Sequence, residues 1–434
     1  MSLKNKSIAL VGYGSSSRAM CNYLLKREIY PVVRNKEIVP VPSGVRLITE
    51  NYLDTSEDIV FRSPGIRPDR IKACGRVTTE VAYALEITRG TKIGISGSDG
   101  KTTTSSLIYN MLTADGLQAT LCGNIGTPVI EYASDSTLNT YTVCELSSFQ
   151  LMDMHPTLDV CAITGISENH LDWHTSMNEY IEAKAHILEN AGLSILNYDD
   201  EIVRGLENRT QASALFSLHD LSSTRVSAEA IAYLKNGYLF CNGAKIISAD
   251  ELRLRGRFNI ANALCALCAV WNIVNIEAIR HTLRTFSGAS GRMELVDSVG
   301  GVDFICSSID STPTRTVATL SALDVSKCVL ILGGYDKGVS YAPLAEATRG
   351  LRGAVLCGAN ADKIESAIKN NTQIKKATRL EDAVMLAVEM ARKGDAVLLS
   401  PASASFDMFN SYKEREQKFK EIVRGLKWKK SGSF

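Results

Sequence analysis

Apolar residues along the chain gather in short runs that polar and glycine-rich turns separate. In the N-terminal part, apolar runs typical of strands lie at 7–11, 30–34, 45–49 and 58–62, and a helical pattern lies at 18–28. Strands that alternate with helical stretches are typical of an α/β fold with a mostly parallel sheet. We therefore predict an α/β domain at the start of the chain.

The same alternation begins again near Lys92 and a third time near Lys327. The second series opens with KIGISGSDGKTTT and ends in a long apolar helix predicted over residues 258–274. A Ser/Gly-rich segment at 286–292 has the composition of a linker. The pattern predicts three consecutive α/β domains, at residues 1–90, 91–288 and 289–434.

Composition and charge narrow the class of protein. The 434 residues are 45% hydrophobic and 22% charged, and 48 Lys and Arg stand against 47 Asp and Glu, for a net charge of +1. This content excludes a disordered chain, and the small net charge argues against a general nucleic-acid binder. No apolar run reaches the roughly 18 residues of a membrane span, so we expect no membrane partner.

The cysteines indicate a reducing compartment. Eleven of them are scattered through apolar segments, an arrangement that suits free thiols in the cytoplasm rather than a disulfide framework. Cys265 and Cys268 form a CxxC inside the predicted long helix, without a second pair or a flanking histidine. We expect this pair to face the core rather than to bind zinc.

A glycine turn between a strand and a helix is the strongest candidate for chemistry. The segment follows the apolar run KIGIS and opens a helical pattern, with the residues Gly97, Ser98, Asp99, Gly100, Lys101, Thr102 and Thr103. Backbone amides in such a turn bind phosphate oxygens, a lysine neutralises β- and γ-phosphates, and a threonine hydroxyl can bind Mg²⁺. The eight-residue phosphate-loop template asks for glycine where Ile95 stands, so the match is to a shorter GxxGKT loop. The alternative is an ordinary glycine turn that caps a helix.

The glycine turn after the first strand is a weaker signal. Gly12 and Gly14 match two positions of a dinucleotide fingerprint, but Ser17 stands at the third. Arg34 lies near the end of the second strand, where that fingerprint expects an acidic residue. NAD binding is therefore not expected, although the turn can still face another phosphate-bearing ligand.

Carboxylate, imidazole and amine groups follow the next strands. Glu145 ends the strand TYTVCE, and a carboxylate there can hold Mg²⁺ beside nucleotide phosphates. His170, in NHLDWH, could bind a second metal or a phosphate, with Asp172 orienting it. Lys184 lies in the helical stretch YIEAK, and Asn124 lies in the tight loop GNIGTP. The alternatives are a surface Glu, a capping turn with exposed histidines, a solvated lysine and a plain turn.

Taken together, these motifs resemble the Mur ligase family, ATP-dependent enzymes that form amide bonds in peptidoglycan synthesis. The shared segments run in family order over essentially the whole chain: GSDGKTTT, GNIGTP, ELSSFQL, NHLDWH, YIEAK, RFNIANALCA, GRMELV, ILGGYDKG and LLSPASASFDMF. The resemblance implies Rossmann-like outer domains around a P-loop ATPase-like central domain. It also implies a cytoplasmic monomer.

RSPGI and the motifs of the third domain are most similar to the family members that add D-glutamate to UDP-N-acetylmuramoyl-L-alanine. The resemblance implies that the first domain binds the UDP sugar, the second ATP and the third D-glutamate. The reaction would phosphorylate a carboxylate and then let the amine attack the acyl phosphate through a tetrahedral intermediate.

The resemblance also assigns roles to individual residues. Thr102 and Glu145 would hold one Mg²⁺, and His170 would hold a second together with Lys184 as an N-carbamate. Asn124 would contact the UDP substrate, and Asn259, Asn262 and Arg292 would lie on the nucleotide side. The residues that match the D-glutamate site are Ser311, Lys337, Ser405, Phe406 and Tyr412.

Several positions depart from the family pattern. A histidine is usual where Phe258 and Gly291 stand, an Asp and a Lys where Ser307 and Ile309 stand, and a glycine where Glu416 stands. Asp310, three residues after Ser307, is a candidate to replace the missing carboxylate. These departures put nucleotide affinity in doubt more than reaction type. They leave two rivals open: another ligase of the superfamily, such as a folylpolyglutamate-synthase-like enzyme, and a nucleotide-binding paralogue without turnover.

Overall fold

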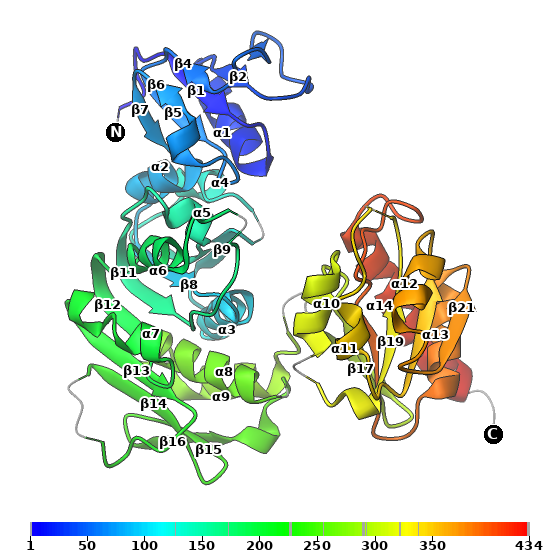
Figure 1. Ribbon diagram of the computed structural model, residues 1–434. Helices are drawn as coiled ribbons and strands as arrows, with labels where there is room; N and C mark the ends of the chain where they lie inside the picture. Colours follow the sequence, from blue (N-terminus) through cyan, green and yellow to red (C-terminus); the bar gives the residue numbers. More distant parts are fainter. Residues whose placement is uncertain are drawn as a thin grey trace. The chain divides into compact units, whose positions relative to one another are not determined.

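The computed structural model describes residues 2–125, 127–171, 173–224, 228–254, 256–288, 291, 293–320, 323–336 and 338–431. The chain divides into two compact units, Met1–Phe286 and Ser287–Phe434. The first contains a five-stranded sheet, a nine-stranded sheet and a two-stranded pair, and the second contains one six-stranded sheet. The predicted α/β class is confirmed, with three helix-covered sheets in succession (Figure 1). The exact domain bounds 1–90, 91–288 and 289–434 stay a prediction.

The N-terminal sheet is entirely parallel, as its alternation of strands and helices predicts. Its order is β3-β2-β1-β5-β7. The strands are β1 (Ile8–Val11), β2 (Val32–Arg34), β3 (Arg46–Ile48), β5 (Ile59–Arg62) and β7 (Arg76–Thr78), beside the small pair β4 (Asp54–Thr55) and β6 (Lys72–Ala73). The helices are α1 (Ser15–Leu25) and α2 (Glu80–Ile87). Arg34, at the end of β2, forms a buried ion pair with Glu57 at 3.0 Å, so Glu57 neutralises its charge.

The central sheet is the largest. Its order is β16-β15-β14-β13-β12-β11-β8-β10-β9, with antiparallel pairing only in the hairpins of β14, β15 and β16 among the described strands. The strands are β8 (Thr91–Ser96), β9 (Ala119–Gly123), β10 (Tyr141–Glu145), β11 (Thr157–Ile163), β12 (Asn190–Asn197), β13 (Ser213–Ser217), β14 (Ala230–Lys235), β15 (Tyr238–Cys241) and β16 (Ala244–Ser248). The helices are α3 (Lys101–Ala114), α4 (Ile130–Ala133), α5 (Ser148–Leu151), α6 (Met177–Ala185), α7 (Glu201–Arg204), α8 (Arg257–Val270) and α9 (Ile276–Thr285).

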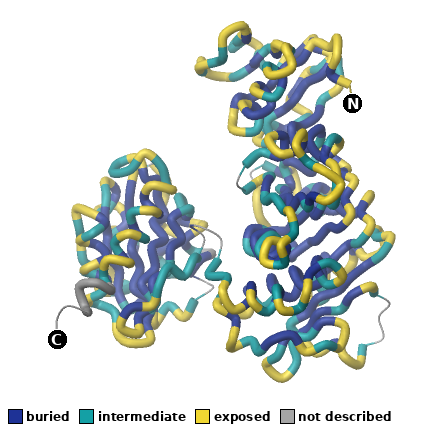
Figure 2. Tube along the Cα trace, turned by 180° about the vertical axis from the view of Figure 1, so that it is seen from behind, coloured by how far each residue is buried: buried dark blue, intermediate teal, exposed yellow. Residues whose placement is uncertain are grey.

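Helix α8 is buried along most of its length. Cys265 and Cys268 lie in its apolar core with α3 and the sheet, so the prediction that this CxxC faces the core is confirmed. The dark central strands in Figure 2 show the same buried layer beneath exposed loops. A rigid layer of this kind can hold the loops at its edge in fixed positions.

The third sheet forms the core of the second unit. Its order is β17-β18-β22-β19-β20-β21, parallel except for the β17–β18 hairpin. The strands are β17 (Glu294–Val299), β18 (Val302–Cys306), β19 (Cys328–Leu332), β20 (Gly353–Cys357), β21 (Ile374–Ala377) and β22 (Ala396–Leu399). The helices are α10 (Pro313–Leu320), α11 (Leu344–Ala347), α12 (Ala361–Ile368), α13 (Leu380–Met390) and α14 (Tyr412–Ser431). Within the described residues, no helix is both long and apolar enough to span a membrane.

Candidate active site

The glycine turn lies where three neighbouring strands end together. Strand β8 runs between β10 and β11, and the register pairs Glu145 with Ile95 and Ile163 with Ser96. The carboxyl ends of all three strands therefore reach the same edge of the sheet. Ligands of open α/β sheets bind at this edge.

The turn itself has a backbone that side chains would obstruct. Gly97 and Gly100 both have positive φ, and Gly100 precedes the first residue of α3 without a side-chain cap. A Cβ at Gly97 would lie 2.0 Å from Thr164 Oγ1, and one at Gly100 would lie 2.3 Å from Asn262 Oδ1. The first amides of α3 keep no capping side chain, which is the arrangement that binds a phosphate.

Two hydroxyls brace this turn from β11 and α6. Thr164 donates a hydrogen bond to the carbonyl of Asp99. The Ser98 hydroxyl lies 2.9 Å from Tyr180 Oη and accepts from the backbone amide of Ser167 at 2.9 Å. The loop is therefore held in its curved form by residues from both neighbouring elements.

A buried carboxylate lies beside the start of α3. Glu145 is fully buried, and its two oxygens accept from Thr102 Oγ1 at 2.7 Å and from Asn124 Nδ2 at 2.8 Å. A buried carboxylate needs a cation or several donors to offset its desolvation. The structure thus brings together three residues that the sequence placed on separate motifs. Their oxygen-rich set is the kind that Mg²⁺ prefers.

Two lysines share the carbonyl of Gly97. Lys101 Nζ donates to it at 2.8 Å and to Ser98 at 2.8 Å, while Lys184 Nζ donates to Gly97 at 2.6 Å. Lys184 is 1% exposed. Its burial, with the positive charge of Lys101, lowers the pKa of Lys184 well below the ordinary value, although Asp99 and Glu145 act in the opposite direction.

His170 is connected to this group through an aromatic side chain. It is exposed, with φ +56°, and its ring packs against Phe149 and Tyr180, 4.9 Å and 6.4 Å between ring centroids. The Tyr180 ring also lies 4.6 Å from Lys184 Nζ. The Tyr180 ring therefore lies beside both residues to which the resemblance gives a common metal. Asp172 lies outside the described residues.

The asparagines of α8 lie next to the glycine turn. Asn262 is buried, with its Oδ1 accepting from Thr104 Oγ1 at 3.4 Å, and its Nδ2 lies 3.4 Å from Asn259 Oδ1. Thr103 is half-buried on the first turn of α3. Arg292 lies outside the described residues.

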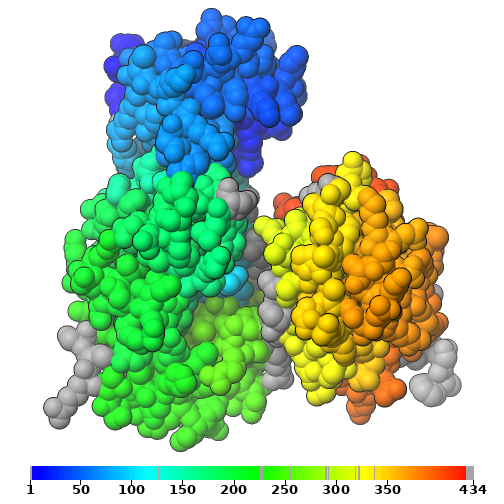
Figure 3. Space-filling model, in the orientation of Figure 1, coloured from blue at the N-terminus to red at the C-terminus, as the bar shows by residue number. Residues whose placement is uncertain are grey.

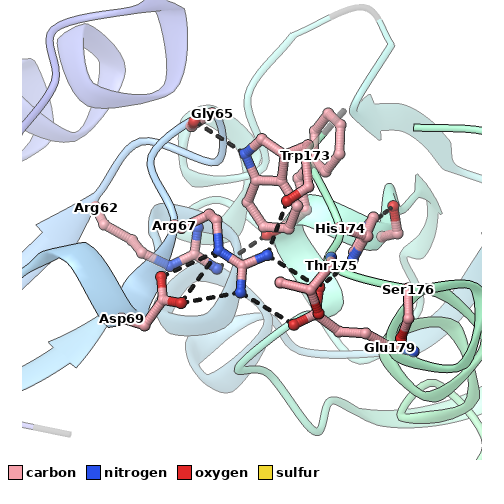
Figure 4. Close-up of polar contacts among 11 residues, drawn as sticks. Arg62, Gly65, Arg67, Asp69, Trp173, His174, Thr175, Ser176 and Glu179 are labelled. Carbon is pink, nitrogen blue, oxygen red and sulfur yellow. Dashed lines mark hydrogen bonds and ion pairs between the residues drawn. The ribbon is translucent and has the colours of Figure 1, made fainter. Parts of the chain in front are cut away.

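The sequence analysis missed a polar network that joins the first sheet to the central one (Figure 4). Arg67 donates to Glu179 at 2.9 and 3.0 Å and to the carbonyl of Trp173 at 2.8 Å. Glu179 Oε2 lies 3.3 Å from Nδ1 of the buried His174, whose Nε2 lies 3.0 Å from Ser148 Oγ. Burial lowers the pKa of His174, which favours the neutral imidazole. The sequence signal for this network was the pair Arg62 and Arg67 near the end of the apolar strand β5, because a buried arginine needs a carboxylate partner.

Arg62 makes a second link across the same junction. Its side chain is fully buried and forms an ion pair with Asp153, with a further hydrogen bond of 2.9 Å to the carbonyl of Phe149. The space-filling view shows the blue N-terminal residues lying directly on the cyan and green residues that follow them (Figure 3). These contacts fix the end of β5 beside α5, whose Phe149 ring packs against His170.

Four of the candidate D-glutamate residues follow two paired strands of the second unit: Ser311 follows β18, and Ser405, Phe406 and Tyr412 follow β22. Ser405 is buried, Phe406 is 65% exposed and its ring lies 6.3 Å from that of Tyr335. The Tyr412 carbonyl accepts from Ser308 Oγ at 2.9 Å, and Ser311 donates its amide to Ile309 at 2.7 Å. Lys337 lies outside the described residues.

Arg415 organises this region and was not predicted. It is 2% exposed and donates to the carbonyls of Ser403 and Ser308, 3.1 Å and 2.9 Å away. Its guanidinium thus ties the loop after β22 to the loop after β18. Asp310, considered above as a replacement carboxylate, is buried and accepts from Thr319 and Ser400, both at 2.7 Å.

Comparison with known proteins assigns the class. A family model described as the Mur ligase middle domain matches residues 95–270, and one described as the Mur ligase, glutamate ligase domain matches residues 291–403. The chain belongs to the Mur ligase family.

Among its relatives are enzymes named UDP-N-acetylmuramoylalanine–D-glutamate ligase. That of Clostridium beijerinckii is 37% identical and covers 97% of each chain, and that of Acetivibrio thermocellus is 36% identical and covers 98% of this chain and 97% of its own. The solved structure of UDP-N-acetylmuramate-alanine ligase MurC from Thermotoga maritima matches with a TM-score of 0.60 and 16% identity, covering 97% of this chain and all of that one. A pseudomurein peptide ligase type C from Methanothermus fervidus matches with a TM-score of 0.56 and 17% identity, over 97% and 100% of the chains. These two structures support the fold alone.

Proposed function

We propose that this chain joins D-glutamate to UDP-N-acetylmuramoyl-L-alanine, using ATP, and releases ADP and phosphate. The observation that carries the proposal is the convergence of Lys101, Thr102, Glu145 and Lys184 on one glycine turn. The names of its full-length relatives supply the two substrates. The reaction class follows from the family to which the chain belongs.

In this reaction both nucleophiles come from the substrates, so the protein mainly has to neutralise the negative charge of the phosphate groups. The substrate carboxylate attacks the γ-phosphorus of ATP, and ADP leaves. The D-glutamate amine then attacks the acyl carbon, and phosphate departs from the tetrahedral intermediate as the amine loses a proton. Amides of the glycine turn and the ammonium of Lys101 would bind the phosphate oxygens and stabilise the charge that develops on them.

The buried oxygen donors fit a resident Mg²⁺. Thr102 and Glu145 would hold it, and it would supply further neutralisation of phosphate charge. Lys184 and His170 would bind a second ion if Lys184 carries a carbamate, since CO₂ adds to a neutral amine and replaces a cation by an anionic oxygen ligand. The lowered pKa of Lys184 favours the neutral amine that this addition requires.

The remaining assignments follow the resemblance. Asn124 would contact the UDP substrate, and Asn259, Asn262 and Arg292 would lie on the nucleotide side. The D-glutamate site would be formed by Ser311, Lys337, Ser405, Phe406 and Tyr412. A monomer in the cytoplasm, without nucleic-acid partners, completes the proposal.

The test is phosphate release from ATP and Mg²⁺ with UDP-N-acetylmuramoyl-L-alanine, in the presence and absence of D-glutamate. L-glutamate and a folate substrate serve as parallel arms. Release that requires both the UDP substrate and D-glutamate is expected. Release with another acceptor or amino acid would replace the substrates and keep the reaction class. ATP binding without release in any arm would favour the paralogue without turnover.

A further inference from the structure

A cluster of metal-ligating side chains lies outside the candidate active site. His155 is in the turn between α5 and β11, His186 follows the last residue of α6, and Glu189 precedes β12. One ligand atom from each lies within 4.8 Å of the other two, and the two imidazole centroids are 4.3 Å apart. None of the three belongs to a motif that the proposed function uses.

The hydrogen bonds around the cluster orient it for metal binding. His186 Nδ1 lies 2.8 Å from the carbonyl of Leu151, which can only accept, so Nδ1 carries a proton and Nε2 is the nitrogen that can bind a metal ion. A ring nitrogen that donates to a backbone carbonyl is the usual support of a metal-bound histidine. His155 Nδ1 lies 2.6 Å from Glu189 Oε2, so one proton lies between two potential ligand atoms.

The cluster is open to solvent on the side of two of its members. The side chains of His155 and Glu189 are 48% and 40% exposed, while His186 is half-buried. An ion can therefore reach the ligand atoms without any opening of the fold. The ion pair of His155 with Glu189 uses neither nitrogen of His186, whose Nδ1 donates to Leu151 and whose ring packs on His155 at 4.3 Å between centroids. A metal ion uses all three groups.

We propose that His155, His186 and Glu189 bind a divalent transition-metal ion of the Zn²⁺ class. Two imidazole nitrogens and one carboxylate oxygen suit Zn²⁺, Co²⁺, Ni²⁺ or Cu²⁺ and do not suit Mg²⁺ or Ca²⁺. The ion replaces the proton between His155 and Glu189, and water completes its coordination. Bonds of about 2.0–2.1 Å bring the ligand atoms closer together than their present limit of 4.8 Å, through rotation of the exposed side chains.

Such an ion would join two segments that the chain separates. It would tie the turn after α5 to the carboxyl end of α6, the helix that carries Tyr180 and Lys184. The expected consequence is a fold of this region that is more resistant to heat when the metal is bound.

The experiment measures Zn²⁺ binding by the full chain in excess Mg²⁺, by competition with a chelating dye. We expect His155→Gln, His186→Gln and Glu189→Gln each to bind one Zn²⁺ fewer than the unaltered protein and to lose the Zn²⁺-dependent rise in Tm. The matched control is His281→Gln, because His281 is an exposed histidine on α9. It should bind as the unaltered protein does.

Co²⁺ supplies a second readout that does not depend on stability. The unaltered protein and His281→Gln should show the visible absorption of low-coordinate Co²⁺, and the three cluster variants should lack that band. The same Zn²⁺ stoichiometry and the same Co²⁺ spectrum in all proteins would overturn the proposal. Circular dichroism without metal verifies that each variant is folded. No readout uses ligase activity, so the result is independent of the proposed reaction.

Discussion

Glu416 occupies the space that a side chain at Gly291 would need. A Cβ on Gly291 would lie 2.4 Å from Glu416 Oε2, and Gly291 has φ +67°. Both positions depart from the family pattern, in which a histidine and a glycine are usual. A side chain at position 291 and the Glu416 side chain therefore compete for the same space. Glu416 is held in place by Lys420, which lies 2.7 Å from both Glu416 and Glu294.

This relationship predicts coupling between the two positions. Gly291→Ala alone should lower the free energy of unfolding by about 1–3 kcal/mol, through overpacking and a left-handed backbone. Gly291→Ala combined with Glu416→Gly should lose less stability than the sum of the single variants. Urea unfolding of the four proteins gives the coupling energy. Additive values would show that the two positions do not compensate each other.

Lys101→Ala should reduce ATP-dependent phosphate release by at least about a hundredfold, because it removes a cation aimed at the developing phosphate charge. The residue is half-buried at the start of α3, and its ammonium donates to two loop carbonyls rather than packing in the core, so the fold should persist. Lys26→Ala, an exposed position after α1, is the control. Near-normal turnover of the Lys101 variant would exclude the phosphate role.

Lys184→Ala should abolish turnover, and small carboxylates such as formate or acetate should partly restore it. The reason is that a free carboxylate can occupy the place of a carbamate. Activity is measured with and without the added acid, and Lys101→Ala serves as a variant that the acid should not rescue. Full activity of Lys184→Ala without any additive would show that its amine has no catalytic role.

Gly97→Ala should weaken ATP binding strongly, because its Cβ would collide with Thr164 Oγ1 and displace the loop. Gly116→Ala is the matched control: Gly116 also has positive φ, but a Cβ there meets no heavy atom within 4 Å. Gly116→Ala should lower the free energy of unfolding by about 1 kcal/mol, through backbone strain alone, and should keep the affinity for ATP. Calorimetric titration with ATP compares the two, and equal affinities would contradict the proposed cradle.

Acid should weaken the junction between the first two sheets. Hydrogen bonds from Arg67 hold the pKa of Glu179 at about 2, below its ordinary value of 4.5. The charged carboxylate therefore stabilises the fold fully above about pH 4.5, and this contribution is lost as the pH falls towards 2. Denaturant unfolding between pH 5 and 3 should show a smaller pH dependence for Glu179→Gln than for the unaltered protein. Glu182 lies on the same helix as Glu179, and its side chain forms an exposed ion pair with Arg209. Glu182→Gln should keep the original pH dependence, because an exposed ion pair contributes little to stability.

Local signals predicted the strand, the glycine turn and the start of the helix at 97–102 well, because this backbone geometry is encoded over a few residues. A strand, a glycine turn and a Lys-Thr pair at the start of a helix leave little freedom for the loop, and Gly97 to Thr102 lie where those signals place them. Local signals said little about Lys184, whose helical pattern is equally typical of a solvated lysine. Its burial against Gly97 depends on the packing of α6 on the central sheet.

The sequence by itself determined the α/β class, the succession of strand and helix elements and the motifs at the strand ends. These properties depend on hydrophobic period and on backbone preferences of nearby residues. Only the tertiary structure decided which distant residues meet: Glu145 with Thr102 and Asn124, Arg67 with Glu179, and Gly291 with Glu416. The physical reason is that strand order and side-chain packing depend on contacts far apart in the chain, which no local pattern specifies.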